Sequence, residues 1–493
     1  MPPPPGSQEE STILEPSSQP SARDAIAPLR RFADQAFSRA AGAPLVPGNE
    51  IRLLKDAAEN YPAWIEAIRS AKQTVHFETY IIHADKVGYE FAELIAAKAR
   101  EGVRVRLIYD WLGARGTASW LFWRRLRKAG VEVRCFNPPR LDSPLAWLSR
   151  DHRKLIAVDG RIGFVTGLCV GQRWVGDPAR RMDPWRDTGV QLEGPAVFDL
   201  ENAFAQMWTA LRPPHSPPDL LPAQVRGPSV GDVALRIVAS QPTLAGLYRL
   251  DQLLGAISRH SIWLTDAYFL GTPSYVQSLC AAALDGVDVR LLVPRTSDLA
   301  IVRSMSRVGY RTLLESGVRI FEWNGSMLHA KTAVVDGRWA RVGSTNLNIA
   351  SWMANYELDV VAEDEPFADA MEEMYLADLD QSTEIILSAK DKVRPRERRH
   401  PRRRRGSARG SVGRAATSVL TIGSTVGTAI TSRRVLGPAE APIMITAAFA
   451  LLLIFAVAVL WPLAVSIPVA IVSAWATLAL LIKALRLRFP ARK

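Results

Sequence analysis

The chain has 493 residues, 48% of them hydrophobic, which is enough for roughly two to four domains with sizeable cores. Its three cysteines are far apart and form no Cys-x-x-Cys pair, which excludes a disulfide framework and a cysteine zinc site and suits a reducing compartment. The net charge of +12 is uneven: from residue 390 onward 19 Lys and Arg outnumber 3 Asp and Glu, a balance of +16, so residues 1–389 carry −4. A nucleic-acid enzyme spreads positive charge over its catalytic face, so no nucleic-acid partner is expected.

Residues 1–47 are expected to form a disordered N-terminus followed by a short helix. The first 20 residues are rich in Pro and Ser and lack the apolar core of a secretory signal. Residues 25–41 have the amphipathic spacing of a packing helix.

An internal repeat organises the middle of the chain. Helix–Gly–Val–strand patterns occur at Gly102 and Gly130, and again at Gly286 and Gly317, with offsets of 184 and 187 residues. Helix followed by strand, repeated, is typical of an α/β protein. We therefore predict two duplicated α/β lobes, at residues 48–212 and 228–389, that face each other and are separated by a Pro-rich linker at 213–227.

Each predicted lobe contains one His-x-Lys-x4-Asp motif. The motif residues are His152, Lys154 and Asp159 in the first lobe, and His329, Lys331 and Asp336 in the second. One copy is a weak signal, but two copies at matching places in a duplicated unit are a strong one. We therefore expect these six residues to be catalytic.

The spacing of the motif has a chemical interpretation. Residues two apart on a strand face the same side, so each His and Lys project together. A histidine can act as a nucleophile or as a general acid or base near neutral pH, and a lysine can bind a phosphate oxygen. The motif aspartate either holds an imidazole or supports the following turn.

A glycine-containing turn follows each motif and is expected to bind the substrate. Gly167 in the first turn and Gly343 in the second would offer backbone N–H groups, and Ser344 and Asn346 would add side-chain donors. Two histidines in one site indicate a two-step displacement through a phospho-histidine. No metal-ligand spacing accompanies them, so neither a metal nor a cofactor is expected.

The C-terminal part is predicted to attach the chain to a membrane. Residues 390–440 form a basic, flexible linker, with Arg at every position from 402 to 405, and 441–482 is a run of 42 uncharged residues. That run is long enough for two bilayer crossings, so we expect a transmembrane or re-entrant helical hairpin. Arg433 and Arg434 precede it and Lys483 begins the basic tail at 483–493, which favours a cytoplasmic side for both ends.

The motifs resemble those of the phospholipase D superfamily, and over residues 48–387 the chain is similar to bacterial cardiolipin synthases. Other short segments that carry the resemblance are Trp185-Arg186-Asp187-Thr188, Glu193-Gly194-Pro195, Ala267-Tyr268-Phe269 and Asn355-Tyr356-Glu357. The resemblance implies two α-β-α sandwich lobes that meet at a pseudo-twofold interface. It also implies transfer of a phosphatidyl group from one phosphatidylglycerol to another, with release of glycerol, at the inner membrane of a bacterium.

The resemblance also implies roles for individual residues. His152 would be the nucleophile, His329 the acid and base, and Asp187 and Glu357 the carboxylates that each brace a histidine. The first turn departs from the family pattern, because Cys169 replaces an Asn and Thr166 replaces a Gly.

Two other functions remain open on the sequence. A phospholipase D or related nuclease would use the same chemistry with water as the second acceptor. A lipid-binding scaffold with a relic site would need no chemistry, but both motif sets are complete. The acidic balance of residues 1–389 and the membrane tail favour a phospholipid substrate and an anionic membrane surface as partners.

Overall fold

The computed structural model describes residues 33–139, 149–211, 226–387 apart from 243 and 299, 393–395, and most of 449–488. Most of the predicted linker at 213–227 and most of the basic linker at 390–440 lie outside these ranges. Residues 33–41 are helical, and Phe37 and Ala41 are buried against the second half of the chain, as expected for a packing helix.

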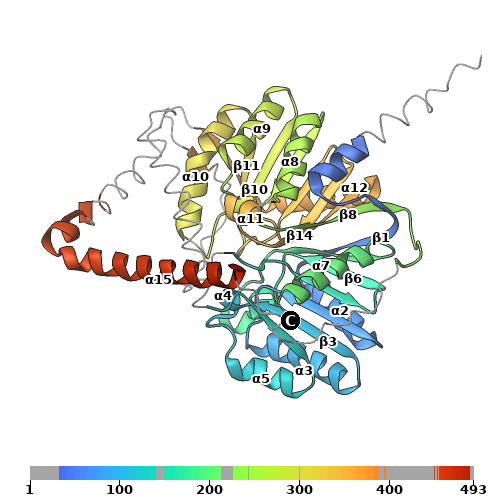
Figure 1. Cartoon of the computed structure of the whole chain (residues 1–493). Coiled ribbons are helices and arrows are strands. Elements are labelled where there is room, and N and C mark those ends of the chain that lie inside the picture. The colour runs from blue at the N-terminus through green and yellow to red at the C-terminus, as the bar shows by residue number, and fades with distance from the viewer. Residues whose placement is uncertain are drawn as a thin grey trace, which may run out of the picture.

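The first half alternates strands and helices, as the repeat predicts (Figure 1). Its strands are β1 (Val46–Lys55), β2 (Thr74–Thr79), β3 (Arg104–Asp110), β4 (Glu132–Phe136), β5 (Leu155–Val158), β6 (Ile162–Thr166) and β7 (Thr188–Glu193). Its helices are α2 (Asp56–Ser70), α3 (Lys86–Arg100), α4 (Trp111–Ala114), α5 (Trp120–Lys128), α6 (Gln172–Val175), the 3-10 turn η2 (Pro178–Arg180) and α7 (Val197–Ala210).

The second half repeats this order. Its strands are β8 (Val233–Ser240), β9 (Ser261–Thr265), β10 (Asp288–Pro294), β11 (Arg319–Trp323), β12 (Thr332–Val335), β13 (Trp339–Gly343), β14 (Glu357–Glu363), β15 (Ser382–Leu387) and β16 (Val393–Pro395). Its helices are α8 (Gly246–Ile257), α9 (Pro273–Leu284), α10 (Ala300–Glu315), α11 (Ile349–Met353) and α12 (Glu365–Asp380).

The repeat glycines adopt the same conformation in both halves. Gly102 and Gly286 have φ of 91° and 95°, and Gly130 and Gly317 have φ of 96° and 93°. This left-handed region costs a glycine little and ends a helix, so the chain can turn directly into a parallel strand. Strands β2, β3 and β4 are accordingly parallel, as are β9, β10 and β11.

The two half-sheets join edge to edge. The strand order is β16-β15-β11-β10-β9-β12-β13-β14-β8-β1-β7-β6-β5-β2-β3-β4, and β1 pairs with both β7 and β8. Asn49, which is fully buried, holds this junction, since its amide donates to the carbonyl oxygens of Val46 at 2.7 Å and Val233 at 3.2 Å. The two halves are therefore tied by one continuous sheet.

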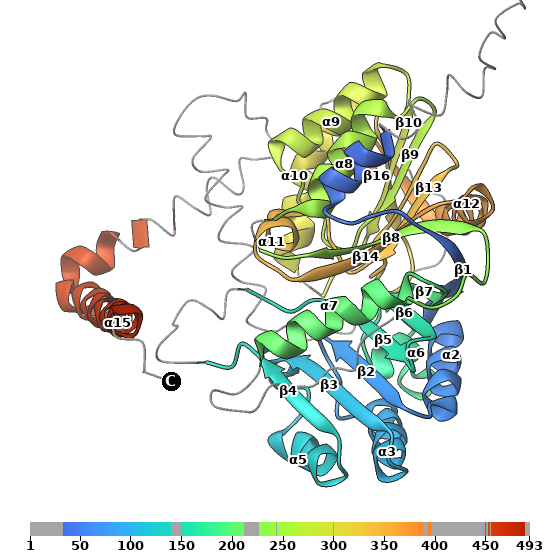
Figure 2. The same cartoon turned by 45° about the vertical axis from the view of Figure 1, so that its right-hand side comes forward.

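Helices cover both faces of each half-sheet. One core packs α2, α3 and α5 against the first half-sheet, and another packs α8, α9 and α10 against the second. A shared core containing Phe204 of α7 and Phe367 of α12 lies between the halves, where Figure 2 shows α7 running across the middle of the molecule. The α/β class is thus confirmed.

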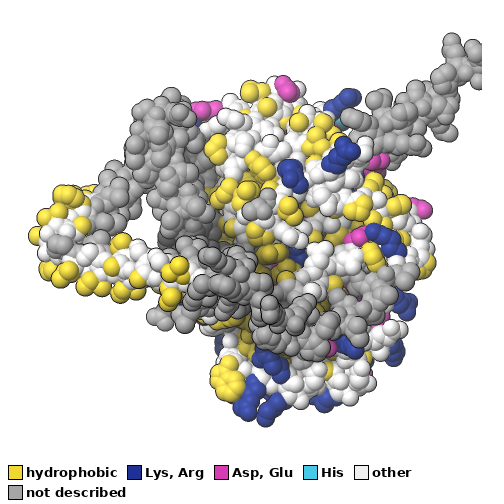
Figure 3. Space-filling view, viewed as in Figure 1, with side chains coloured by type: hydrophobic (Ala, Val, Ile, Leu, Met, Phe, Trp, Pro, Cys, Tyr) yellow, Lys and Arg dark blue, Asp and Glu magenta, His cyan; other side chains and the backbone are white. Residues whose placement is uncertain are grey.

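The C-terminal helix α15 (Pro462–Arg488) lies beside the two lobes, apart from their sheet (Figure 1). Its exposed side chains are largely hydrophobic (Figure 3). Within the described part of the chain, no helix combines the length and the apolarity that a membrane crossing needs. Residues 393–395, placed in a flexible linker by the sequence, form β16 at the edge of the sheet.

Candidate active site

Two backbone contacts bring the motifs to the interface between the halves. His152 precedes β5, and its N–H donates to Tyr356 O at 2.9 Å in the other half. His329 precedes β12, and its N–H donates to Arg186 O at 2.7 Å, again across the interface. The segment before each motif strand is therefore bonded to the residue that precedes the opposite carboxylate.

Each histidine is held, or braced, by a carboxylate from the other half, so that the two pairs cross the interface. His152 Nδ1 lies 2.8 Å from Glu357 Oε2, and His329 Nδ1 lies 2.7 Å from Asp187 Oδ2. Both carboxylates are fully buried, and each faces the histidine of the other half. Because Nδ1–H donates to a carboxylate, Nε2 of each ring is left for a substrate.

The turn glycine of the first half makes room for its carboxylate. A Cβ on Gly167 would lie 2.1 Å from Asp187 Oδ1, and a Cβ on Gly343 would lie 2.2 Å from Asp359 Oδ1. The amides of both glycines bond within the protein, to Thr188 O at 3.0 Å and Lys331 O at 3.3 Å. The two glycines therefore leave space for carboxylates, and their N–H groups are already bonded within the protein.

The two lysines lie beside their own histidines. Lys154 Nζ donates to His152 O at 2.6 Å, and Lys331 Nζ donates to His329 O. Both side chains are buried, and burial, together with the neighbouring Lys154, lowers the pKa of Lys331 to about 8 even though Asp187 raises it. A phosphate entering between them would meet two cations that have no carboxylate bonded to their ammonium groups within the described residues.

The charge balance keeps both histidines neutral and both braces ionised. Burial lowers the pKa of His152 against the pull of Glu357, and burial and Lys331 lower the pKa of His329 to about 4. Burial alone would raise the pKa values of Asp187 and Glu357. The facing histidines hold these pKa values below their usual ranges. Neutral imidazoles are the form that can attack phosphorus or accept a proton.

The motif aspartates lie away from the histidines. Asp159 accepts the backbone N–H groups of residues 72, 73 and 74 at 2.7–2.8 Å, and Asp336 accepts those of 259, 260 and 261 at 2.8–2.9 Å. Both have φ of 52°, a left-handed conformation that Asp tolerates in turns. Of the two roles that the sequence left open, their contacts correspond to support of the turn.

The second turn carries polar groups that the first lacks. Ser344 Oγ donates to Glu357 Oε2 at 2.6 Å and so positions the brace of His152. The amide oxygen of Asn346 is buried and has no hydrogen-bond partner among the described residues. At the matching place the first turn has Cys169, whose pKa burial raises, so its thiol stays neutral.

Four aromatic residues near the histidines were not singled out for the site from the sequence. Tyr80 lies edge-on to His152 at 5.1 Å, and Tyr268 lies edge-on to His329 at 6.0 Å. Trp174 donates Nε1–H to Asp187 Oδ2 at 3.0 Å, and Trp185 packs on His329 at 5.6 Å. Trp185 and Tyr268 lie in short segments that carry the family resemblance, but such segments do not indicate which side chains touch.

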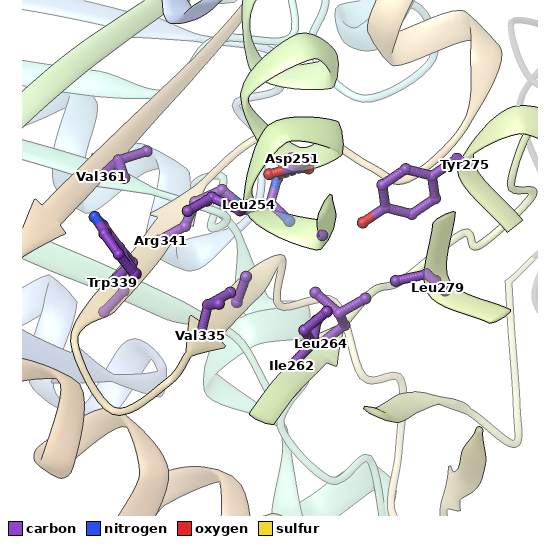
Figure 4. A pocket seen from close by; sticks show the side chains of 13 residues that line it. Asp251, Leu254, Ile262, Leu264, Tyr275, Leu279, Val335, Trp339, Arg341 and Val361 are labelled. Carbon is purple, nitrogen blue, oxygen red and sulfur yellow. Dashed lines mark ion pairs between the residues drawn. The ribbon is translucent and has the colours of Figure 1, made fainter. Parts of the chain in front are cut away.

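A cavity in the second half, under α8, is separate from the motifs. Figure 4 shows apolar side chains lining it around the Asp251–Arg341 ion pair, whose atoms are 3.8 Å apart. It is part of the core. Among the described residues, no three His, Cys, Asp or Glu side chains are grouped to hold a metal ion.

Comparisons with known proteins identify the family of the chain and several relatives. The family model described as "Cardiolipin synthase, PLD-like domain" matches residues 64–208 and 253–379, one segment in each half. The chain is 32% identical over 354 residues to a cardiolipin synthase of Alkalihalophilus pseudofirmus, covering 70% of this chain and 69% of the relative. It is 34% identical over 355 residues to cardiolipin synthase A of Pseudomonas entomophila, covering 69% and 71%.

A solved structure with a similar fold is phosphatidylserine synthase of Haemophilus influenzae, with a TM-score of 0.56 at 15% identity. The match covers 72% of this chain and 92% of that protein. At this identity the likeness concerns the fold alone.

Proposed function

The chain belongs to the cardiolipin synthase family with a PLD-like domain, and from this we propose that it moves a phosphatidyl group from one phosphatidylglycerol to the hydroxyl of a second phospholipid. The observation that carries the proposal is the crossed pair of braced histidines, His152 with Glu357 and His329 with Asp187. Two neutral imidazoles at one interface suit a double displacement, in which one ring holds the transferred group while the other handles protons.

In the first step His152 is the nucleophile. Its Nε2 lone pair forms a bond to phosphorus, and the bond from phosphorus to the glycerol headgroup oxygen breaks. His329 donates a proton to the departing oxygen, so glycerol leaves as an alcohol. Lys154 and Lys331 hold the non-bridging oxygens, and the negative phosphate between them raises the low pKa of His329, which makes its protonated form available.

In the second step the acceptor hydroxyl takes the place of glycerol. His329, now neutral, removes the hydroxyl proton as the oxygen bonds to phosphorus, and the bond from phosphorus to His152 Nε2 breaks. The products are the diphosphatidyl lipid and the enzyme, with His329 carrying the proton of the acceptor hydroxyl. When the phosphate leaves, the pKa of His329 falls again and the neutral resting form returns. Asn346 follows the same turn as Ser344, and its side-chain NH2 group is proposed as a further donor to the phosphate oxygens.

The proposed setting is an anionic membrane surface on the cytoplasmic side of the bacterial inner membrane. The uncharged segment at 441–482 would insert as a hairpin. Helix α15, which contains its second half, exposes Leu463 at 69% and Ile471 at 63%, which favours burial in lipid. The basic segment at 390–409 would attract the anionic leaflet.

Helix α5 in the first half offers a second contact with the lipid surface. Trp120 and Leu121 at its start are 65% and 57% exposed, and its last turn carries Arg125, Arg127 and Lys128. Exposed apolar residues next to basic ones on an amphipathic helix are typical of binding at a membrane interface.

The direct test uses membranes from cells that express the chain and phosphatidylglycerol labelled in its acyl chains. We expect a labelled diphosphatidyl lipid and free glycerol. The matched controls are His152→Ala and His329→Ala, which should form neither product. Phosphatidic acid as the sole labelled product would replace the transferase with a hydrolase that uses water as the second acceptor.

A further inference from the structure

The two half-sites differ just outside the paired histidines. Arg173 on α6 follows His152 by 21 residues, and the residue at the same spacing from His329 is Ala350 on α11. Trp185 stands two residues before Asp187, and Asn355 stands two before Glu357. One side of the interface therefore presents an arginine and a tryptophan where the other presents an alanine and an asparagine.

Arg173 and Trp185 form a stack that ends on His329. The guanidinium of Arg173 lies 5.5 Å from the centre of the Trp185 ring, and that ring lies 5.6 Å from the His329 ring at a tilt of 33°. Trp185 N–H donates to Arg173 O at 3.0 Å, which fixes the two residues to each other. The buried ring of Trp174 packs edge-on against Trp185, with ring centres 5.0 Å apart.

The charge of Arg173 has no counterion in the described part of the chain. Its side chain is half-buried, and no carboxylate there lies within ion-pair distance. On the same loop, Arg180 is paired with Asp177 at 3.4 Å and Asp177 also accepts two backbone N–H groups. A half-buried guanidinium without a counterion, stacked on an aromatic ring, suits bidentate contact with a phosphate.

The stack leads to the histidine at which the acceptor hydroxyl is proposed to react. An acceptor phospholipid carries its own phosphodiester one glycerol unit from that hydroxyl, whereas water and simple alcohols carry none. Lys154 and Lys331 serve the phosphate that reacts, so a second phosphate requires a cation of its own. Arg173 is such a cation on the His329 side.

We propose that Arg173, held on Trp185, is a binding subsite for the phosphodiester of the acceptor lipid and selects a second phospholipid over uncharged alcohols and water. This inference rests on the proposed function, since it assigns the acceptor side of the same site. An arginine meets two phosphate oxygens at once, so it also fixes the direction from which the acceptor hydroxyl approaches His329.

The test is a competition between two acceptors for one phosphatidyl-enzyme. The purified full-length protein in mixed micelles receives phosphatidyl-p-nitrophenol with acyl chains of distinct mass, together with phosphatidylglycerol and ethanol. Mass spectrometry gives the ratio of diphosphatidyl lipid to phosphatidylethanol. Partial misfolding lowers both products alike, so the ratio reports acceptor choice alone.

Arg173→Gln should lower this ratio roughly tenfold to a hundredfold, the effect of losing a charge-assisted contact. Arg173→Lys should give a ratio between those of Arg173→Gln and the wild type, because lysine keeps the positive charge but cannot contact two phosphate oxygens at once. Arg180→Gln is the matched control on the same loop and should leave the ratio unchanged.

An unchanged ratio in Arg173→Gln would overturn the inference, and a raised KM for the p-nitrophenyl donor with an unchanged ratio would assign Arg173 to the donor instead. Failure of the proposed function looks different. The wild type would then form only phosphatidic acid, whatever the residue at position 173.

Discussion

The crossed braces predict that the carboxylates Asp187 and Glu357 act on different steps. In Asp187→Asn the group facing His329 loses its charge while keeping its shape. Asp187 Oδ2 accepts from both His329 and Trp174, and Oδ1 accepts from Thr188 N–H at 2.9 Å. Whichever way the amide is turned, its NH2 group therefore faces another donor. Where it faces His329, the imidazole is driven to shift its proton to Nε2 and to accept at Nδ1.

That shift would disable His329 as a base, because the ring nitrogen facing the substrate would already carry the proton. Loss of one hydrogen bond to a charged group costs about 1.5–3 kcal/mol, which corresponds to a roughly ten- to hundredfold slower turnover. The tautomer change adds to this figure. Glu357→Gln should slow turnover by a similar factor, but through the nucleophile His152.

A donor with a good leaving group separates the two effects. Phosphatidyl-p-nitrophenol needs no proton on its leaving oxygen, so the first step depends on His152 alone. Stopped-flow absorbance should show a fast burst of p-nitrophenolate followed by slow turnover in Asp187→Asn, and loss of the burst in Glu357→Gln. Burst amplitude is divided by the folded fraction from thermal unfolding, so that damage to stability is not mistaken for a kinetic effect.

The outcome that refutes the assignment is specific. A burst retained by Glu357→Gln and lost by Asp187→Asn would reverse the roles of the two histidines. Equal loss of the burst in both variants would mean that the braces act on a single step.

Three further predictions concern pH, metals and the lipid surface. Because burial depresses the histidine pKa values, kcat/KM should fall on the acid side only below the ordinary histidine pKa of about 6.5. On the alkaline side kcat/KM should fall near pH 8, as Lys331 loses its proton. A decrease on the acid side that begins above pH 7 would contradict the first expectation. Dialysis against EDTA should leave turnover intact, and loss that a divalent ion restores would show that a metal is required. The double variant of Trp120→Ala and Leu121→Ala should lower activity on anionic vesicles severalfold but not on a monomeric short-chain donor, whereas Leu284→Ala, an equally exposed change in the second half, should affect neither.

Much of the fold could be predicted because its signals are local. Gly102 and Gly286 end helices in the same left-handed conformation, which a glycine followed by a β-branched run indicates directly. The motif histidines and lysines could be placed in one site because a duplicated unit tends to bring equivalent residues to its pseudo-symmetry axis. The edge-to-edge joining of the half-sheets could not be predicted, since the pairing of β1 with β8 depends on the long-range contacts of Asn49.

The crossing of the braces was also beyond the sequence. Asp187 follows His152 along the chain, and Glu357 follows His329, so spacing alone is compatible with bracing inside each half. The pairing across the halves results from the interface hydrogen bonds of Tyr356 with His152 and of Arg186 with His329, which no local pattern encodes. The roles of the motif aspartates were ambiguous for the same reason, because a carboxylate that supports a turn and one that orients an imidazole can occur at the same spacing.

The crossed arrangement has a consequence for how such a site can become asymmetric. Each histidine depends on a carboxylate from the other half, so the loss of either brace disables a histidine that the other half supplies. The histidine, lysine and bracing carboxylate of the two halves are therefore constrained together. Residues farther from the histidines bear no such mutual constraint. There, at matching sequence spacings, the first half has Arg173 and Trp185 where the second has Ala350 and Asn355. The proposed chemistry needs identical histidines in unequal roles, and these outer residues are where the two half-sites differ enough to receive different molecules.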